Sequence, residues 1–210
     1  MERIIGSISA LKNGPVGARI QGRMGGFRAA GAGSAEDLFS ELCFCILTAN
    51  YSAEGGMRIQ KEIGDGFIAL DLDALSRRLK ALGYRFPNAR AGYIASNRAH
   101  IPFLKDAISL EKAPFERREW LVENIMGFGY KEASHFLRNI GQSDFAIVDF
   151  HIVDLLVRHG MIRKPKTRSL NRKAYLEVEA KLGEIAKRAG LSQGELDLYL
   201  WYMETGKILK

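Results

Sequence analysis

Most apolar residues in this sequence recur every three or four positions, the spacing of one face of an α-helix. Ser34 precedes one such run as an N-cap with acidic residues in the first turn, and Gly190 ends another. Ser192 and Glu195 have the spacing of a capping box that opens a last helix. Alternating strand patterns are scarce, and the best of them, residues 145–150, is short. The pattern predicts a mostly α-helical fold.

Composition removes several classes of protein from consideration. The longest uncharged apolar run, residues 42–49, is far too short to cross a bilayer, and the N-terminus lacks the features of a secretion signal. Cys43 and Cys45 are the only cysteines, so they cannot supply a four-cysteine zinc or iron–sulfur site. We therefore expect one compact cytoplasmic protein of 210 residues with no metal site and no membrane contact.

The charge balance favours a polyanionic partner. The chain has 31 Lys and Arg against 24 Asp and Glu, a net charge of +7, and nucleic acid is the usual polyanion for such a protein. Residues 163–173 form a dense basic segment without an acidic residue. This segment is either a solvated loop or a contact for phosphates, and the sequence alone does not separate the two.

Residues 13–33 depart from the helical pattern. They contain seven glycines together with Arg19, Arg23 and Arg28. We expect irregular backbone or a small hairpin here. A flexible connection is the favoured interpretation, and a close approach of the backbone to a phosphate is the alternative.

The segment with the clearest chemical content is residues 127–156. A short amphipathic helix ends at Gly127, and a second begins after Gly129 and ends at Gly141. Two helices joined by Gly-Phe-Gly describe a helix-hairpin-helix, in which backbone N–H groups approach an external anion at the positive end of the second helix. An ordinary hairpin of two helices without a ligand is the alternative.

Lys131 lies in the first turn of that second helix. The helix macrodipole disfavours a cation there by roughly 0.3–1 kcal/mol. The same field destabilises the ammonium form, and an amine must be neutral to act as a nucleophile. The alternative is a lysine that simply extends into water.

Asp149 is the predicted partner of Lys131. The second hairpin helix rises roughly 14 Å, and residues 141–148 span up to roughly 26 Å when extended, so the chain can return beside Lys131. Asp149 would then start the next helix, residues 150–158, where the dipole keeps a carboxylate ionised and an N-cap role is compatible with catalysis. His151 could donate to a phosphate from the same helix end, although a surface histidine fits the spacing equally well.

An amine nucleophile, a nearby carboxylate and an anion-binding hairpin suit one reaction class. The amine attacks the anomeric carbon of a nucleoside and the base leaves. The carboxylate stabilises the positive charge that grows on the sugar and helps to manage the proton of the amine. A Schiff base follows, and β-elimination then nicks the strand.

Three separated segments resemble the helix-hairpin-helix DNA glycosylase superfamily, and in detail its archaeal-type 8-oxoguanine DNA glycosylase/AP lyases: GFGYKEASHFLRNIG, VDFH and WYMETGKILK. The likeness covers essentially the whole chain. It implies an all-α, two-lobed fold with the active site in the cleft between the lobes. One lobe would comprise approximately residues 35–145, including the hairpin, and the other residues 1–34 plus 146–210.

The resemblance also implies roles for individual residues. Lys131 matches the Schiff-base lysine, and Asp149 matches the essential aspartate that follows the hairpin. Gly127, Gly129 and His151 match residues that contact the DNA backbone. Asn50 matches the residue that enters the space left by the flipped nucleotide. Trp201, Phe86 and the terminal carboxylate at Lys210 match the groups that recognise the damaged base. Flipping is needed because the anomeric carbon cannot be reached inside a stacked duplex. Without the resemblance, Trp201 and Phe86 would be interpreted as core residues and Asn50 as a helix C-cap.

Two departures from the wider superfamily narrow what the resemblance implies. Residues 141–148 lack the proline that precedes the aspartate in much of the superfamily. The cysteine tetrad of the endonuclease III branch is also absent, so no iron–sulfur cluster is expected. We expect no required cofactor, and the resemblance leaves open whether hairpin carbonyls hold a monovalent cation on DNA.

The sequence therefore predicts a monomeric enzyme that removes 8-oxoguanine from double-stranded DNA and cleaves the abasic strand through Lys131. One alternative is a glycosylase for another oxidised base, for instance an oxidised pyrimidine. Another is a non-catalytic helix-hairpin-helix DNA-binding module, whose salt-dependent affinity would be untouched by Lys131→Gln. Such a module would leave Lys131 and the returning Asp149 unexplained.

Overall fold

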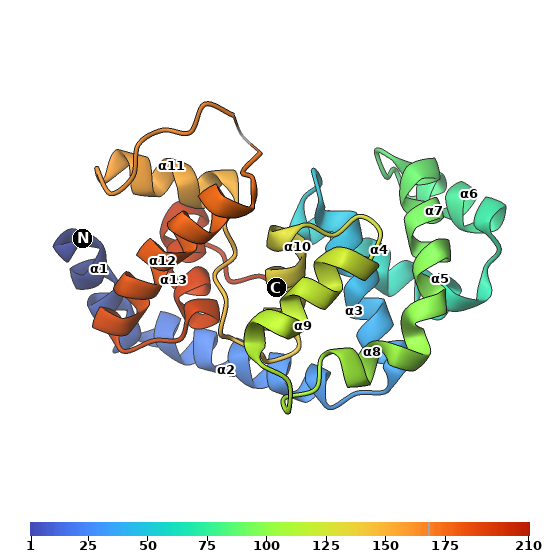
Figure 1. Ribbon diagram of the computed structural model, residues 1–210, viewed down its shortest axis with the longest axis horizontal. Coiled ribbons are helices and arrows are strands. Elements are labelled where there is room, and N and C mark those ends of the chain that lie inside the picture. Colours follow the sequence, from blue (N-terminus) through green and yellow to red (C-terminus); the bar gives the residue numbers. More distant parts are fainter. Residues whose placement is uncertain (168) are drawn as a thin grey trace. The chain divides into compact units, whose positions relative to one another are not determined.

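The computed structural model describes residues 1–167 and 169–210, and these residues contain helices and no strand (Figure 1). The predicted all-α fold is confirmed. The chain forms two compact units: unit 1 comprises residues 1–28 and 141–210, and unit 2 comprises residues 29–140. Within the described residues, no helix combines the length and the apolar character that a membrane span needs.

Unit 2 is built around α3 (Ala35–Thr48), which contacts α4, α5, α7, α8 and α10. Ser34 caps α3 as predicted: its Oγ accepts a hydrogen bond from the Asp37 N–H at 3.1 Å, and the Asp37 carboxylate accepts one from the Ser34 N–H at 2.9 Å. Nearly every residue of α3 after this first turn is buried, as expected for a central helix. The other helices of unit 2 are α4 (Ala53–Ile63), α5 (Gly66–Ala69), α6 (Leu72–Ala81), α7 (Pro87–Asn97), η1 (Arg98–His100), α8 (Ile101–Ala107), α9 (Pro114–Asn124) and α10 (Tyr130–Asn139).

A buried carboxylate joins three helices of unit 2. Glu41 on α3 accepts a hydrogen bond from the Asn139 amide of α10 at 2.7 Å and another from the Gln60 amide of α4 at 3.3 Å. A buried charge is tolerated only when it is hydrogen-bonded, so this network favours one arrangement of the three helices. It fixes the end of α10, the helix that carries Lys131 at its beginning.

Unit 1 contains the N-terminal helices and the C-terminal helices of the chain, and α12 packs against α1 and α13. The caps of α12 are confirmed, because Asn171 Oδ1 accepts from the Ala174 N–H at 2.9 Å and Gly190 has φ +65°. The capping box predicted for α13 forms only in part: Ser192 Oγ accepts from the Glu195 N–H, whereas the Glu195 carboxylate accepts from Gln21. The helices are α1 (Glu2–Lys12), most of α2 (Pro15–Gly31), α11 (Phe150–Arg158), α12 (Arg172–Ala189) and α13 (Gln193–Thr205).

The prediction of irregular backbone at residues 13–33 is wrong, because most of this segment forms the helix α2. Its buried residues Ile20, Met24 and Phe27 lie on one face. Two of the glycines serve close packing: a Cβ on Gly17 would lie 2.1 Å from the Lys12 carbonyl oxygen, and one on Gly31 would lie 2.1 Å from the Ile140 carbonyl oxygen. Glycine is required at these points for contact between backbones, so neither a turn nor a ligand explains it.

Candidate functional site

The predicted hairpin lies in unit 2 between α9 and α10. Gly127 has φ +91°, and a Cβ built on it would lie 2.7 Å from the Tyr93 ring. Gly129 is the N-cap of α10 and has an extended conformation, with φ −115°. α10 begins after Gly129 and ends before Gly141 as predicted, but α9 ends at Asn124, short of the predicted end at Gly127. Of the two hairpin glycines, only Gly127 needs glycine for its backbone conformation.

Side chains outside the hairpin hold its turn in place. The Asn97 amide donates to the Met126 carbonyl at 3.0 Å, and the Met126 N–H donates to Asn97 Oδ1 at 2.9 Å. Asn97 is 1% exposed, so the side-chain half of this double hydrogen bond is buried. Phe128, at the tip of the Gly-Phe-Gly sequence, is buried and packs near Phe136 of α10. The backbone of the turn is thus fixed before any ligand arrives.

We predict that Gly127→Ala destabilises the hairpin. Alanine at a positive φ is strained, and its Cβ would overlap the Tyr93 ring, so the free energy of unfolding should fall by about 1–3 kcal/mol. Chemical denaturation measures the change. Gly83→Ala is the matched control, because Gly83 also has a positive φ of +76° but would place its Cβ in open space. Equal losses for the two variants would contradict the close contact with Tyr93.

Lys131 is partly buried and forms an ion pair with its neighbour in the sequence. Its Nζ lies 3.7 Å from Glu132 Oε1, and the two side chains are 27% and 17% exposed. Glu132 Oε2 also accepts a hydrogen bond from the Gly129 N–H at 3.3 Å, which caps α10. Lys131 therefore does not simply extend into water. Glu132 was not predicted as a site residue, although its position three residues after the N-cap is a capping-box signature.

The segment that leads to Asp149 is extended but is not a strand. Its backbone groups bond to side chains of α12: Glu179 accepts from the Ala146 N–H at 3.1 Å, and the Tyr175 hydroxyl donates to the Ala146 carbonyl at 2.8 Å. The Val148 N–H donates to the same hydroxyl at 3.2 Å. The alternating pattern thus marks an extended segment whose partner is a helix.

Asp149 is the N-cap of α11, as predicted. Its Oδ1 accepts a hydrogen bond from the Ile152 N–H at 2.9 Å. The His151 ring contacts two aromatic rings, with its centroid 4.0 Å from that of Phe150 and 5.2 Å from that of Trp201 on α13. Unit 1 therefore brings the predicted residues Asp149, His151 and Trp201 to the same end of α11. His151 therefore packs against neighbouring aromatic rings and is not an isolated surface side chain.

The remaining predicted residues divide between the units. Lys131, Asn50 and Phe86 belong to unit 2, whereas Asp149 and Lys210 belong to unit 1. The approach of Asp149 to Lys131 and the role of the terminal carboxylate stay predictions.

Asn50 and Phe86 lie on two segments that pack together in unit 2. The Tyr84 hydroxyl donates to the Leu47 carbonyl at 2.8 Å, and Arg90 donates to the Ala49 carbonyl at 3.3 Å. Burial raises the pKa of Tyr84, so its hydroxyl keeps the proton that it donates.

The structure tests the alternative interpretations of Asn50 as a helix C-cap and of Phe86 as a core residue. The C-cap of α3 is Ala49, so the interpretation of Asn50 as the C-cap is wrong by one residue. Asn50 directly follows the cap with φ +63°, a conformation that asparagine adopts just after a helix end. Phe86 is 38% exposed, with the Arg85 guanidinium 5.0 Å from its ring centroid, so the interpretation of Phe86 as a core residue is wrong.

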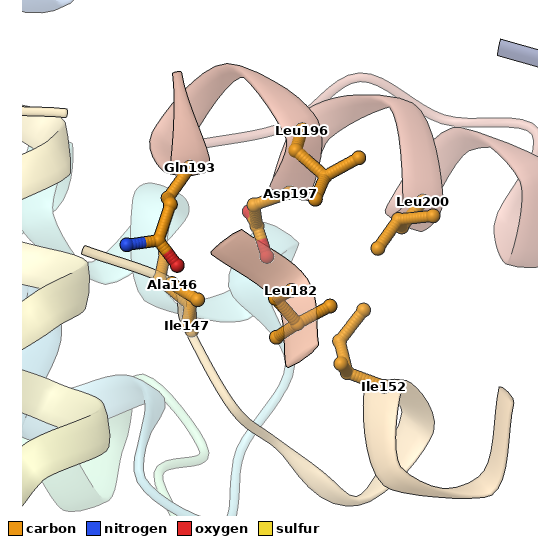
Figure 2. Close-up of a pocket in the computed structure, with 8 residues that line it drawn as sticks. All are labelled: Ala146, Ile147, Ile152, Leu182, Gln193, Leu196, Asp197 and Leu200. Atoms are coloured by element: carbon orange, nitrogen blue, oxygen red, sulfur yellow. The ribbon is translucent and has the colours of Figure 1, made fainter. Parts of the chain in front are cut away.

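A narrow gap lies inside unit 1 between the segment before Asp149 and helices α11, α12 and α13 (Figure 2). Figure 2 shows mainly apolar side chains around it, with the Gln193 amide at one end. It has no room for a water molecule, so it is a packing gap rather than a base-binding pocket. Within the part of the chain that the structure describes, no three His, Cys, Asp or Glu side chains cluster as metal ligands.

Comparison with known proteins identifies the family. The sequence matches the family described as 8-oxoguanine DNA glycosylase over residues 20–191. The chain belongs to the 8-oxoguanine DNA glycosylase family. An "8-oxoguanine DNA glycosylase/AP lyase" of Korarchaeum cryptofilum is 48% identical over 210 residues, which is 100% of this chain and 99% of that protein.

Solved structures of family members have the same fold. The 8-oxoguanine DNA glycosylase of Thermotoga maritima matches with a TM-score of 0.93 and 44% identity, over 100% of this chain and 99% of that one. The 8-oxoguanine glycosylase/lyase of Methanocaldococcus jannaschii, crystallised with a 15mer DNA containing 8-oxoguanine, matches with a TM-score of 0.94 and 48% identity, over 99% of this chain and 100% of that one.

Proposed function

We propose that this family member is a bifunctional 8-oxoguanine DNA glycosylase/AP lyase that acts on double-stranded DNA inside the cell, as a monomer. The observation that carries the proposal is a partly buried lysine in the first turn after a rigid glycine hairpin, in a chain that matches 8-oxoguanine glycosylase/lyases over its whole length. The structure of a relative with 8-oxoguanine DNA supports the choice of substrate.

In the proposed reaction, Lys131 is the nucleophile. Its neutral Nζ bonds to C1′ of the damaged nucleotide as the bond between C1′ and the base breaks. The amine loses one proton, and the C1′–O4′ bond then breaks as O4′ takes up a proton, which leaves a protonated Schiff base between Nζ and C1′. Removal of a C2′ proton breaks the C3′–O bond and expels the 3′ phosphate. No step needs an external oxidant or reductant, so the residues named here need no cofactor.

Asp149 would stabilise the positive charge on the sugar. This role requires unit 1 to present Asp149 to the hairpin of unit 2 across an interlobe cleft. Asp149 lies at the N-terminus of α11, where its side chain caps the helix. Its charge would act on C1′ as the base leaves and would help to accept a proton of the amine.

The other predicted residues would bind the substrate around this centre. Gly127, Gly129 and His151 would contact the DNA backbone, with a monovalent cation on the hairpin carbonyls as a further candidate contact. Asn50 would enter the space of the flipped nucleotide, and its exposure after α3 suits that role. The base would lie between aromatic faces and the terminal carboxylate, using Trp201, Phe86 and Lys210.

A panel of duplexes tests the proposal. We expect excision and strand cleavage with an 8-oxoguanine duplex, and cleavage alone with a duplex that already contains an abasic site. An oxidised pyrimidine duplex should react at least tenfold more slowly. Preference for the pyrimidine would support the other glycosylase, and binding without any cleavage would support the non-catalytic module.

The basic segment 163–173 should contribute to DNA affinity. Arg163, Lys164 and Lys166 are exposed between α11 and α12, whereas Arg168 lies outside the described residues. Neutralising the three exposed residues with Gln should reduce the slope of log affinity against log salt by about 1–3. The control is Lys181→Gln, because Lys181 is already paired with Glu184 at 2.9 Å. An unchanged slope in the triple variant would show that the segment is a solvated loop.

A further inference from the structure

The side chains of Lys131 and Glu132 meet although they are consecutive in a helix. Consecutive helical residues point about 100° apart and do not normally face each other. Here the capping hydrogen bond from the Gly129 N–H turns the Glu132 carboxylate back towards the start of α10. That rotation brings its second oxygen, Oε1, to 3.7 Å from Lys131 Nζ.

We infer that Glu132 is a positioning residue for Lys131: its carboxylate pairs with the Lys131 side chain and holds Nζ at the start of α10 until the damaged nucleotide enters. One carboxylate oxygen caps the helix and the other faces the ammonium group. Attack on the nucleotide then requires the ion pair to open and the amine to lose its proton. The inference rests on the proposed function, because only a nucleophilic Lys131 needs such a partner.

Partial burial makes the ion pair more effective than one on the open surface. The Glu132 side chain is 17% exposed and that of Lys131 is 27% exposed, so water screens their attraction less than it screens a fully exposed pair. The carboxylate also lies where the N-terminal dipole favours a negative charge. Glu132 therefore offsets the unfavourable position of the ammonium group.

Glu116 provides a matched residue with the capping role alone. It occupies the corresponding position of α9, where its Oε2 accepts from the Ala113 N–H at 2.9 Å. The residue before it is Phe115, so the cap is formed without a lysine at the position that Lys131 takes in α10. Any effect of Glu132 that Glu116 does not share comes from the lysine pair.

The test measures the reactivity of Lys131 without DNA. Formaldehyde and cyanoborohydride methylate lysines through an imine, and only a neutral amine forms it. Peptide mass spectrometry follows Lys131, with the exposed Lys61 as internal reference. Glu132→Gln removes the charge but keeps an oxygen that can cap Gly129, so Lys131 should be methylated about two- to fivefold faster than in the wild-type protein. Glu116→Gln should leave the Lys131 rate unchanged.

Salt dependence provides a second measurement, which uses the wild-type protein alone and so does not depend on whether a variant folds. In the wild-type protein, molar salt should screen the ion pair and accelerate methylation of Lys131 relative to Lys61. Equal Lys131 rates in wild type and Glu132→Gln, or no effect of salt in the wild type, would overturn the inference. The proposed function fails separately, if the protein forms no covalent adduct with 8-oxoguanine DNA under borohydride.

Discussion

Lys131→Gln is expected to lose strand cleavage by roughly 10³-fold or more and to lose all covalent trapping by borohydride. Glutamine fills a similar volume in the first turn of α10 and has no nucleophilic amine. The Gly129 cap and the Asn97 contacts do not involve the Lys131 side chain, so the hairpin should keep its structure. DNA affinity should therefore stay within about threefold of the wild type, because one lysine supplies at most about one phosphate contact.

Gel analysis of borohydride reactions measures strand cleavage and covalent trapping, and fluorescence anisotropy measures DNA affinity. Lys181→Gln is the matched control, since it also removes a lysine with a carboxylate partner, but on α12. A Lys131→Gln variant that still cleaves the abasic strand would contradict the assignment of the nucleophile. A variant that loses binding and cleavage together would indicate that Lys131 acts mainly in DNA affinity.

Asp149→Asn is expected to slow base excision by about 10²–10³-fold, the usual loss when one group that stabilises a transition-state charge is removed. The substitution is conservative for the fold. Asparagine caps helices about as well as aspartate, so the hydrogen bond from the Ile152 N–H to this side chain should survive. Stability and DNA affinity should change little, and the loss should appear in the single-turnover rate.

Asp71→Asn controls for loss of charge at an N-cap. Asp71 caps α6, and its Oδ1 accepts from the Ala74 N–H at 2.7 Å, which matches the geometry at Asp149. This variant should excise 8-oxoguanine at the wild-type rate. If Asp149→Asn were equally active, the carboxylate would be only a cap, and the chemical role proposed for it would be wrong.

Features that depend on nearby residues could be predicted from the sequence. The caps at Ser34, Asn171 and Asp149 each bond to a backbone N–H three residues later, so a short window of sequence contains both partners. The limits of α10 follow from Gly129 and Gly141 in the same way. The position of Lys131 in the first turn of α10 can therefore be predicted from the sequence.

Features that depend on distant contacts could not be predicted. Position 31 must be glycine because the carbonyl of Ile140, a residue far along the chain, lies where a side chain would be. The sequence shows the glycine but not this contact, so a helical segment resembles a flexible one. Residues 145–150 alternate like a strand, but Phe150 begins the helix α11, and Glu179 and Tyr175 of α12 supply the hydrogen-bond partners of the residues before it. The contact of Glu132 with Lys131 was missed for a related reason, since it arises only when the cap turns the carboxylate back.

Locating the trapped adduct tests the central claim most directly. The wild-type protein should be reacted with an 8-oxoguanine duplex under borohydride, digested, and sequenced by mass spectrometry. The account predicts a single deoxyribose-derived adduct on Nζ of Lys131. An adduct on another lysine or on the N-terminal amine, or a duplex that is cleaved without any adduct, would contradict it.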